Sequence, residues 1–157
     1  MHNADIMTTV TPIVTWLLLI CGWYALHATA VVRARRQEEL ARVEDIVKRI
    51  VSIRDKSIAY YTNGSNAPDQ LATQALLKYE LQSLASWVNV LRARKPKYYD
   101  LDSEQIALRK AVTGGEFESA KRAPAAPNEP VVQELWYCSD RFMVALHEEF
   151  EKANKRG

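Results

Sequence analysis

Histidine and cysteine are the side chains with which this chain could bind a metal or carry out acid–base chemistry, and both are scarce. There are three histidines and two cysteines, namely His2, His27, His147, Cys21 and Cys138. None of them stands among acidic residues at the spacing of a metal site, which needs three or four ligands close together. The run His147-Glu148-Glu149 is more typical of the polar edge of a helix. We therefore expect neither a metal nor another cofactor.

Arg141 and His147 are the sharpest enzymatic candidates, and they stand as R-x5-H in the last predicted helix. This spacing is similar to the R-x4-to-6-H motif of helical ribonucleases of the HEPN class, which carry it in a comparable bundle. The resemblance implies a ribonuclease with Arg141 and His147 as catalytic residues. Six steps of about 100° nevertheless place the two side chains about 240° apart on one helix. In the alternative interpretation, both simply face solvent.

An apolar segment occupies residues 10–32, and residues 6–32 contain no Asp, Glu, Lys or Arg. As a helix this segment would rise about 34 Å, enough to cross a hydrocarbon core of roughly 30 Å. The pattern predicts a transmembrane helix over residues 10–32 after a short external tail, residues 1–9. The alternative is a signal peptide cleaved at Ala28-Thr29-Ala30, but such peptides begin with positive charges that this segment lacks.

The apolar segment is followed by three arginines, whereas no Lys or Arg precedes it: Arg33, Arg35 and Arg36. Loops rich in Lys and Arg stay on the cytoplasmic side of a membrane. We therefore expect the N-terminus outside and the C-terminal domain in the cytoplasm, with the bacterial inner membrane as the location. The arginines would also meet anionic lipid headgroups. Two cysteines that we interpret as reduced agree with a cytoplasmic domain.

One face of the predicted membrane helix carries residues at spacings of four, three and four: Cys21, Ala25, Ala28 and Val32. Small side chains let helices approach closely in lipid. This face therefore indicates packing against another membrane protein or a second copy of the chain. The alternative is an ordinary anchor in which these residues are merely tolerated. His27 could serve a proton path or a partner contact, although a place near the interface is the simpler explanation.

The rest of the chain, residues 33–157, has helical periodicity and predicts a small all-α domain. Only 5 of the 157 residues are glycine, which favours helices over a turn-rich β fold. No Pro or Gly occurs from Trp23 to Thr62, so the transmembrane helix is expected to continue unbroken into the domain. The predicted helices would pack as an antiparallel bundle, and they cover about 33–62, 69–94, 103–113 and 129–155.

Apolar residues at alternating spacings of three and four mark the core face of each long helix. The first stripe is Val43, Ile46, Ile50, Ile53, Ser57 and Tyr60. The second is Gln74, Leu77, Leu81, Leu84, Val88 and Leu91. The last helix contributes Val132, Leu135, Phe142, Leu146 and Phe150. We also expect Trp87 and Trp136 in the core, and the basic groups around Arg92–Lys97 and Lys121–Arg122 in solvent.

Composition limits the function further. Hydrophobic residues make up 48% and charged residues 25%, as in a globular protein, and a net charge of +2 is too small to indicate nucleic acid. No small-molecule ligand is evident. We expect a single-pass membrane-anchored helical protein-interaction module, for example an adaptor, assembly or regulatory factor of a membrane system. A phage or mobile-element connection is an analogy of fold only. The alternative is a membrane-tethered HEPN-like ribonuclease or defence effector using Arg141 and His147.

Overall fold

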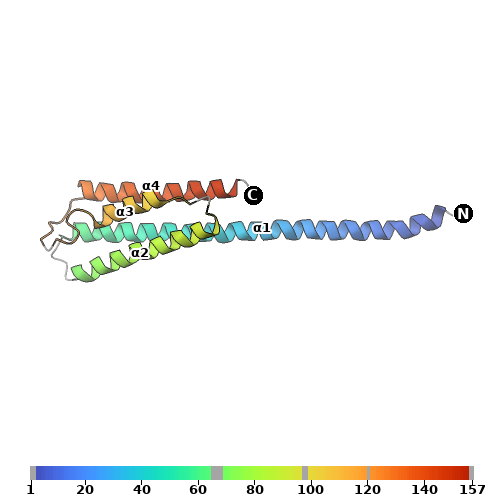
Figure 1. The fold of residues 1–157 in the computed structure, drawn as a ribbon, viewed down its shortest axis with the longest axis horizontal. Helices are drawn as coiled ribbons and strands as arrows, with labels where there is room; N and C mark the ends of the chain where they lie inside the picture. The colour runs from blue at the N-terminus through green and yellow to red at the C-terminus, as the bar shows by residue number, and fades with distance from the viewer. Residues whose placement is uncertain (1–2, 65–68, 97–98, 120, 156–157) are drawn as a thin grey trace. The chain divides into compact units, whose positions relative to one another are not determined.

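The computed structural model describes residues 3–64, 69–96, 99–119 and 121–155, with side chains from residue 15 onward. As predicted, the described residues form helices and no strand. Figure 1 shows the four helices, which are α1 (Asn3–Thr62), α2 (Gln70–Arg94), α3 (Asp102–Thr113) and α4 (Pro130–Asn154). Pro130 opens α4, at a position where its missing N–H removes no helical hydrogen bond.

The predicted continuity of the first helix is confirmed, because α1 is one helix through residues 30–40. No Pro or Gly lies between Trp23 and Thr62 to remove a backbone hydrogen bond or to loosen the chain. The structure nevertheless divides into two compact units, Met1–Glu39 and Leu40–Gly157. Each unit is described below by itself.

Within the described part of the chain, one helix, Thr15–Thr62, is long and apolar enough to cross a membrane, and its apolar part lies in the first unit. The side chains of residues 15–38 are exposed. They include Trp16, Leu18, Trp23 and Leu26, whose exposed fractions lie between 66% and 73%. Soluble monomers rarely leave so large an apolar surface in contact with water.

The second unit contains a bundle whose core is the one that helical periodicity predicts. All six residues of the α1 stripe, from Val43 to Tyr60, are buried. The six predicted residues of α2 and the five of α4 are buried as well. α3 packs more closely against α4 than against α2. The two long helices and the second half of α1 therefore supply most of the core, and α3 covers one side of α4 (Figure 1).

Residues from the connections complete this core. Tyr99, between α2 and α3, is fully buried and has a φ of 63°, in the left-handed region. Its N–H donates to Glu149 Oε2 over 3.1 Å, and its carbonyl oxygen accepts from Arg92 Nε over 3.3 Å. Arg92 also lies 2.5 Å from Asp102 Oδ1. Arg92 therefore holds the connection between α2 and α3 against α2. Lys97, which we also expected in solvent, lies outside the described residues.

Candidate functional site

Arg141 and His147 are both exposed on α4, and each contacts a different group. Arg141 Nη2 is 3.3 Å from Glu104 Oε1 on α3. His147 Nδ1 is 3.0 Å from the carbonyl oxygen of Met143, one turn earlier. Since α4 is regular between them, the separation of about 240° around the helix applies. Within the described residues we find no contact that brings this arginine and this histidine to one place.

The residues predicted to act in the membrane segment are exposed on α1. The predicted packing face consists of Cys21, Ala25, Ala28 and Val32. The flanking basic group consists of Arg33, Arg35 and Arg36. His27 stacks on Trp23, with ring centroids 5.4 Å apart and an angle of 9° between the planes. A stacked pair one turn apart along a helix is a local arrangement, and it places one face of the imidazole against an aromatic ring.

Trp136, expected in the core, is 45% exposed, so that expectation was wrong. The guanidinium group of Arg54 on α1 lies over its ring, 3.8 Å from the ring centroid, and 3.7 Å from Asp140 Oδ1. Trp136 follows the buried Leu135 and therefore lies about 100° away from the core stripe. At that edge the indole covers an arginine through a cation–π contact and does not enter the core.

Arg122 lies in the connection between α3 and α4, where we expected it in solvent, but it is only 4% exposed, so that expectation was wrong. Its Nη2 donates to the carbonyl oxygens of Tyr60, over 3.0 Å, and Gly64, over 2.9 Å. Its guanidinium carbon lies 3.6 Å from the centroid of the Tyr60 ring. The last carbonyl groups of a helix have no partner within the helix and carry partial negative charge. Arg122 neutralises that end of α1.

The same end of the bundle is tied together by buried tyrosine and glutamine side chains. Gln74 Nε2 donates to Tyr60 Oη, over 2.7 Å, and to the carbonyl oxygen of Phe117, over 2.9 Å. Tyr61 Oη donates to the carbonyl oxygen of Val112 over 2.9 Å. Burial, together with the neighbouring Tyr60, raises the pKa of Tyr61 to about 12, and the nearby Arg122 opposes this shift. This network joins the end of α1 to α2 and to the residues that follow α3.

The buried thiol of Cys138 is poorly suited to chemistry. Burial raises its pKa, the carboxylate of Glu134 raises it further, and Arg141 opposes the shift. The thiolate is the nucleophilic and metal-binding form of cysteine. Cys138 therefore serves as an apolar core residue, and both it and Cys21 are free thiols.

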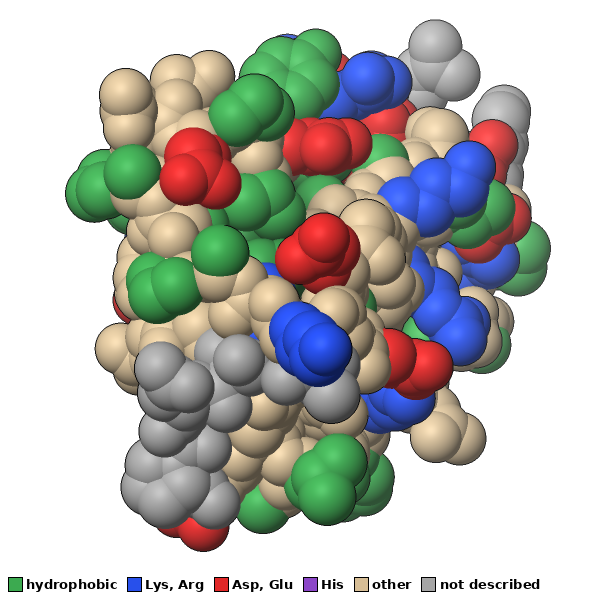
Figure 2. Space-filling view, turned by 90° about the vertical axis from the view of Figure 1, so that its left-hand side faces the viewer, with side chains coloured by type: hydrophobic (Ala, Val, Ile, Leu, Met, Phe, Trp, Pro, Cys, Tyr) green, Lys and Arg blue, Asp and Glu red, His purple; other side chains and the backbone are tan. Residues whose placement is uncertain are grey.

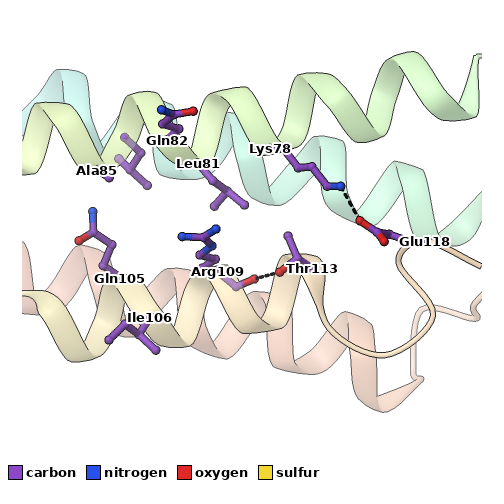
Figure 3. A pocket seen from close by; sticks show the side chains of 10 residues that line it. Lys78, Leu81, Gln82, Ala85, Gln105, Ile106, Arg109, Thr113 and Glu118 are labelled. Atoms are coloured by element: carbon purple, nitrogen blue, oxygen red, sulfur yellow. Dashed lines mark hydrogen bonds and ion pairs between the residues drawn. The ribbon is translucent and has the colours of Figure 1, made fainter.

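A groove of about 890 Å³ separates α2 from α3 (Figure 3). Its lining is mixed, and includes Leu81, Gln82, Ala85, Gln105, Ile106 and Arg109. The ion pair between Lys78 and Glu118 closes one end, and the hydrogen bond from Lys78 lowers the pKa of Glu118. No histidine or cysteine lies among these lining residues, and Lys78 and Glu118 at its end pair with each other.

On the end of the bundle where α1 ends and α2 begins, hydrophobic, basic and acidic side chains are mixed, without a large area of one kind (Figure 2). No group of acidic, histidine and cysteine side chains that could hold a metal occurs among the described residues. No protein-family model, curated protein or solved structure matches the chain. A function for this protein therefore has to be inferred from the physical chemistry of its own residues.

Proposed function

We propose that this protein is a single-pass membrane-anchored helical protein-interaction module. The observation that supports this most directly is the contrast between the two units. The side chains of residues 15–38 are exposed and largely apolar, whereas the buried core begins at Val43. A lipid bilayer is the environment in which a helix of this length and composition is stable. The bundle, in turn, has a core of its own and offers surfaces but no catalytic constellation among its described residues.

The orientation that we propose has the N-terminus outside and the bundle in the cytoplasm of a bacterial cell. It rests on Arg33, Arg35 and Arg36, which directly follow the apolar segment. In this arrangement the face containing Cys21 and Ala25 would contact another membrane helix within the bilayer, while the bundle would contact a partner in the cytoplasm. The protein would then act as an adaptor, assembly or regulatory factor of a membrane system.

The placement is tested by two reporters fused after Gly157. A green fluorescent protein, which is fluorescent only when it folds in the cytoplasm, should give signal. Alkaline phosphatase, which is active only after export, should give none. The reverse pattern would contradict the orientation, and recovery of the fusion in the soluble fraction after cell lysis would contradict the anchor.

The interaction role is tested by chemical cross-linking of the full-length chain in membranes, followed by purification under denaturing conditions. The matched control replaces residues 10–32 with an unrelated membrane span. Adducts that vanish with the replaced span lie in the bilayer, and adducts that remain involve the bundle. Absence of any specific adduct with either chain would overturn the proposal.

The ribonuclease alternative makes a different prediction for His147. If the protein cleaved RNA through Arg141 and His147, the full-length chain in detergent would degrade a labelled RNA, and His147→Ala would abolish that activity. We expect the wild-type chain and the variant to leave the RNA intact equally. RNA cleavage that is lost in His147→Ala would replace our proposal with the enzymatic one.

A further inference from the structure

The outer side of α2 carries a second stripe at heptad spacing, in addition to the buried one. Its seven residues follow one another at spacings of four, three, four, three, four and three: Ala72, Leu76, Tyr79, Ser83, Ser86, Val90 and Ala93. Ser83 is half-buried and the other six are exposed. At about 100° per residue this outer stripe lies on the opposite side of α2 from the core stripe. Such spacing is typical of a seam between two helices.

The outer stripe is free of charge, which is unusual for the solvent side of a bundle helix. Between Gln70 and Leu91, α2 contains only two charged residues, Lys78 and Glu80. Both are engaged at the flanks, since Lys78 pairs with Glu118 and Glu80 with Lys56 of α1. A quarter of the whole chain is charged, so a neutral face of this length is the exception here.

Apolar side chains stand out from this neutral face. Leu76 is 44% exposed, Tyr79 68% and Val90 49%. Between Tyr79 and Val90 lie Ser83 and Ser86, whose small side chains allow another helix to approach closely. Interfaces between proteins are enriched in tyrosine and depleted of charged residues at their centres. Tyr79 and the absence of charged residues in the outer stripe agree with this pattern.

We propose that the outer stripe of α2 binds the outer stripe of a second copy of this chain about a two-fold axis. In a two-fold interface, residues near the axis meet their own copies, so a charge there would face a like charge. A face without charge avoids this repulsion, so two copies of the stripe can meet at the axis. Ser83 is the middle residue of the seven, which brings the two Ser83 side chains close to the axis in either a parallel or an antiparallel pairing.

The size of the contact also fits a second copy, in an argument that rests on the proposed membrane anchor. The stripe is about 32 Å long, and a single pair of helices lies at the small end of specific interfaces. Two chains anchored in one membrane share their orientation and are confined to two dimensions, which raises their effective concentration. A contact of modest area is then sufficient to form a dimer.

The experiment is disulfide cross-linking of the full-length chain in isolated membranes. The background variant is Cys21→Ala, which leaves Cys138 as a buried thiol. Ser83→Cys should form a disulfide-linked dimer under mild oxidation about tenfold faster, or more, than a matched control, Glu148→Cys, at an exposed position on α4 distant from Cys138. Equal rates for the two variants, or no dimer with Ser83→Cys, would overturn the proposed pairing.

A second variant tests the role of charge without requiring a cysteine. Ser83→Arg places two like charges near the axis and should abolish the dimer that amine-reactive cross-linkers capture, while the circular dichroism spectrum stays helical. Glu134→Arg, the control, should leave the dimer intact. A dimer that survives Ser83→Arg would contradict the proposal. So would quenching by spin-labelled lipid of a fluorophore attached to the Ser83→Cys variant, which would assign the stripe to the membrane surface.

Failure of the proposed pairing can be distinguished from failure of the proposed function. Carbonate extraction of the same membranes reports on the anchor. A chain that is extracted by carbonate refutes the anchor whatever the cross-linking shows, whereas a chain that resists extraction but fails to form the Ser83→Cys dimer refutes the pairing and leaves the anchor standing.

Discussion

At the scale of single residues, a buried cation organises one end of the bundle. Arg122 enters from a connection, yet it satisfies carbonyl groups at the end of α1, which has no basic residue in its own last turn. No carboxylate pairs with it within the described residues. Its charge is balanced by helix carbonyls and by the face of Tyr60. This guanidinium group therefore contributes to the stability of this end, beside the hydrogen bonds of Gln74 and Tyr61.

Replacing that group tests the interpretation. Arg122→Met removes the donor and leaves the carbonyl groups of Tyr60 and Gly64 buried and unpaired, so we expect a loss of about 2–4 kcal/mol in the free energy of unfolding. The measurement is urea-induced unfolding of the full chain in detergent. Lys121→Met, at the exposed neighbouring position, should change the stability by less than about 0.5 kcal/mol. Equal effects of the two substitutions would show that Arg122 does not hold the end of α1.

Tyr61 gives this end of the bundle a dependence on alkaline pH. Its pKa is raised from an ordinary value of 10.0 to about 12, chiefly by burial. A group with a raised pKa in the folded state stabilises that state below its unfolded pKa, and the stabilisation is lost as the pH rises. We expect the contribution of Tyr61 to the free energy of unfolding to be constant below about pH 10 and to be lost between about pH 10 and 12.

Tyr61→Phe separates this titration from the others. The variant should lose about 1 kcal/mol at neutral pH, because the hydrogen bond to the Val112 carbonyl is gone. Its free energy of unfolding should then fall less steeply with rising pH than that of the wild type between about pH 10 and 12. Unfolding curves across this range, with absorbance of the ionised tyrosines as a second readout, check both points. Parallel pH profiles for the two proteins would refute the assignment.

At the scale of elements, α1 combines two kinds of helix. Its apolar half is exposed on all described sides, whereas its second half buries one stripe from Val43 to Tyr60. The residues between the two halves, including Arg33 and Arg36, are polar, and α1 remains one helix through them. Their charges suit water or lipid headgroups and not the hydrocarbon interior of a membrane. In our proposal this change in polarity marks the membrane surface and sets the orientation of the chain.

The orientation should therefore respond to charge near the span. Replacing Arg33, Arg35 and Arg36 with Asn, and adding lysines through Thr8→Lys and Thr9→Lys, should place the C-terminal reporter outside in a substantial fraction of molecules. Fluorescence and phosphatase activity of the Gly157 fusions measure that fraction.

The control for this experiment removes three positive charges elsewhere, in the variant Lys121→Asn, Lys152→Asn and Lys155→Asn. These positions are distant in sequence from the span, so the orientation should not change. An orientation that is insensitive to the first variant, or that responds equally to both, would argue against the arginines as its determinant.

At the scale of the whole molecule, the two units differ in what they need from their surroundings. Every residue of the hydrophobic core lies at or after Val43, and the boundary between the units lies between Glu39 and Leu40. A fragment of residues 38–157 retains this core, so we expect it to be soluble without detergent, helical, and to unfold in one cooperative transition. Circular dichroism with thermal and urea unfolding measures this.

A shorter fragment, residues 48–157, is the matched control. It lacks Val43 and Ile46, which are buried, and it should have a clearly lower unfolding midpoint because their contacts in the core are lost. Aggregation of the longer fragment, or a broad non-cooperative transition, would show that the bundle depends on the apolar segment.

Local periodicity in the sequence was enough to predict the fold class, the continuity of α1 and the buried stripes of α1, α2 and α4. A helix repeats every 3.6 residues, so a stripe such as Leu77 to Leu91 shows which face is apolar before any contact is known. The apolar length of residues 10–32 was likewise visible directly. These properties depend on residues that are close together in the sequence, so the sequence of one chain is enough to predict them.

Only the tertiary structure determined the positions of residues that lie outside any periodic pattern. Arg122, Tyr99 and Phe117 lie in connections, where no repeat predicts burial, and each is placed in the core by segments distant in sequence. The prediction for Trp136 was wrong for a related reason. Whether a residue at the edge of an apolar stripe is buried depends on the neighbouring helix, and here Arg54 of α1 covers the ring. The outer stripe of α2 followed the same rule. Heptad spacing was present in the sequence of α2, but only the packing of its other face showed that the stripe from Ala72 to Ala93 is left exposed.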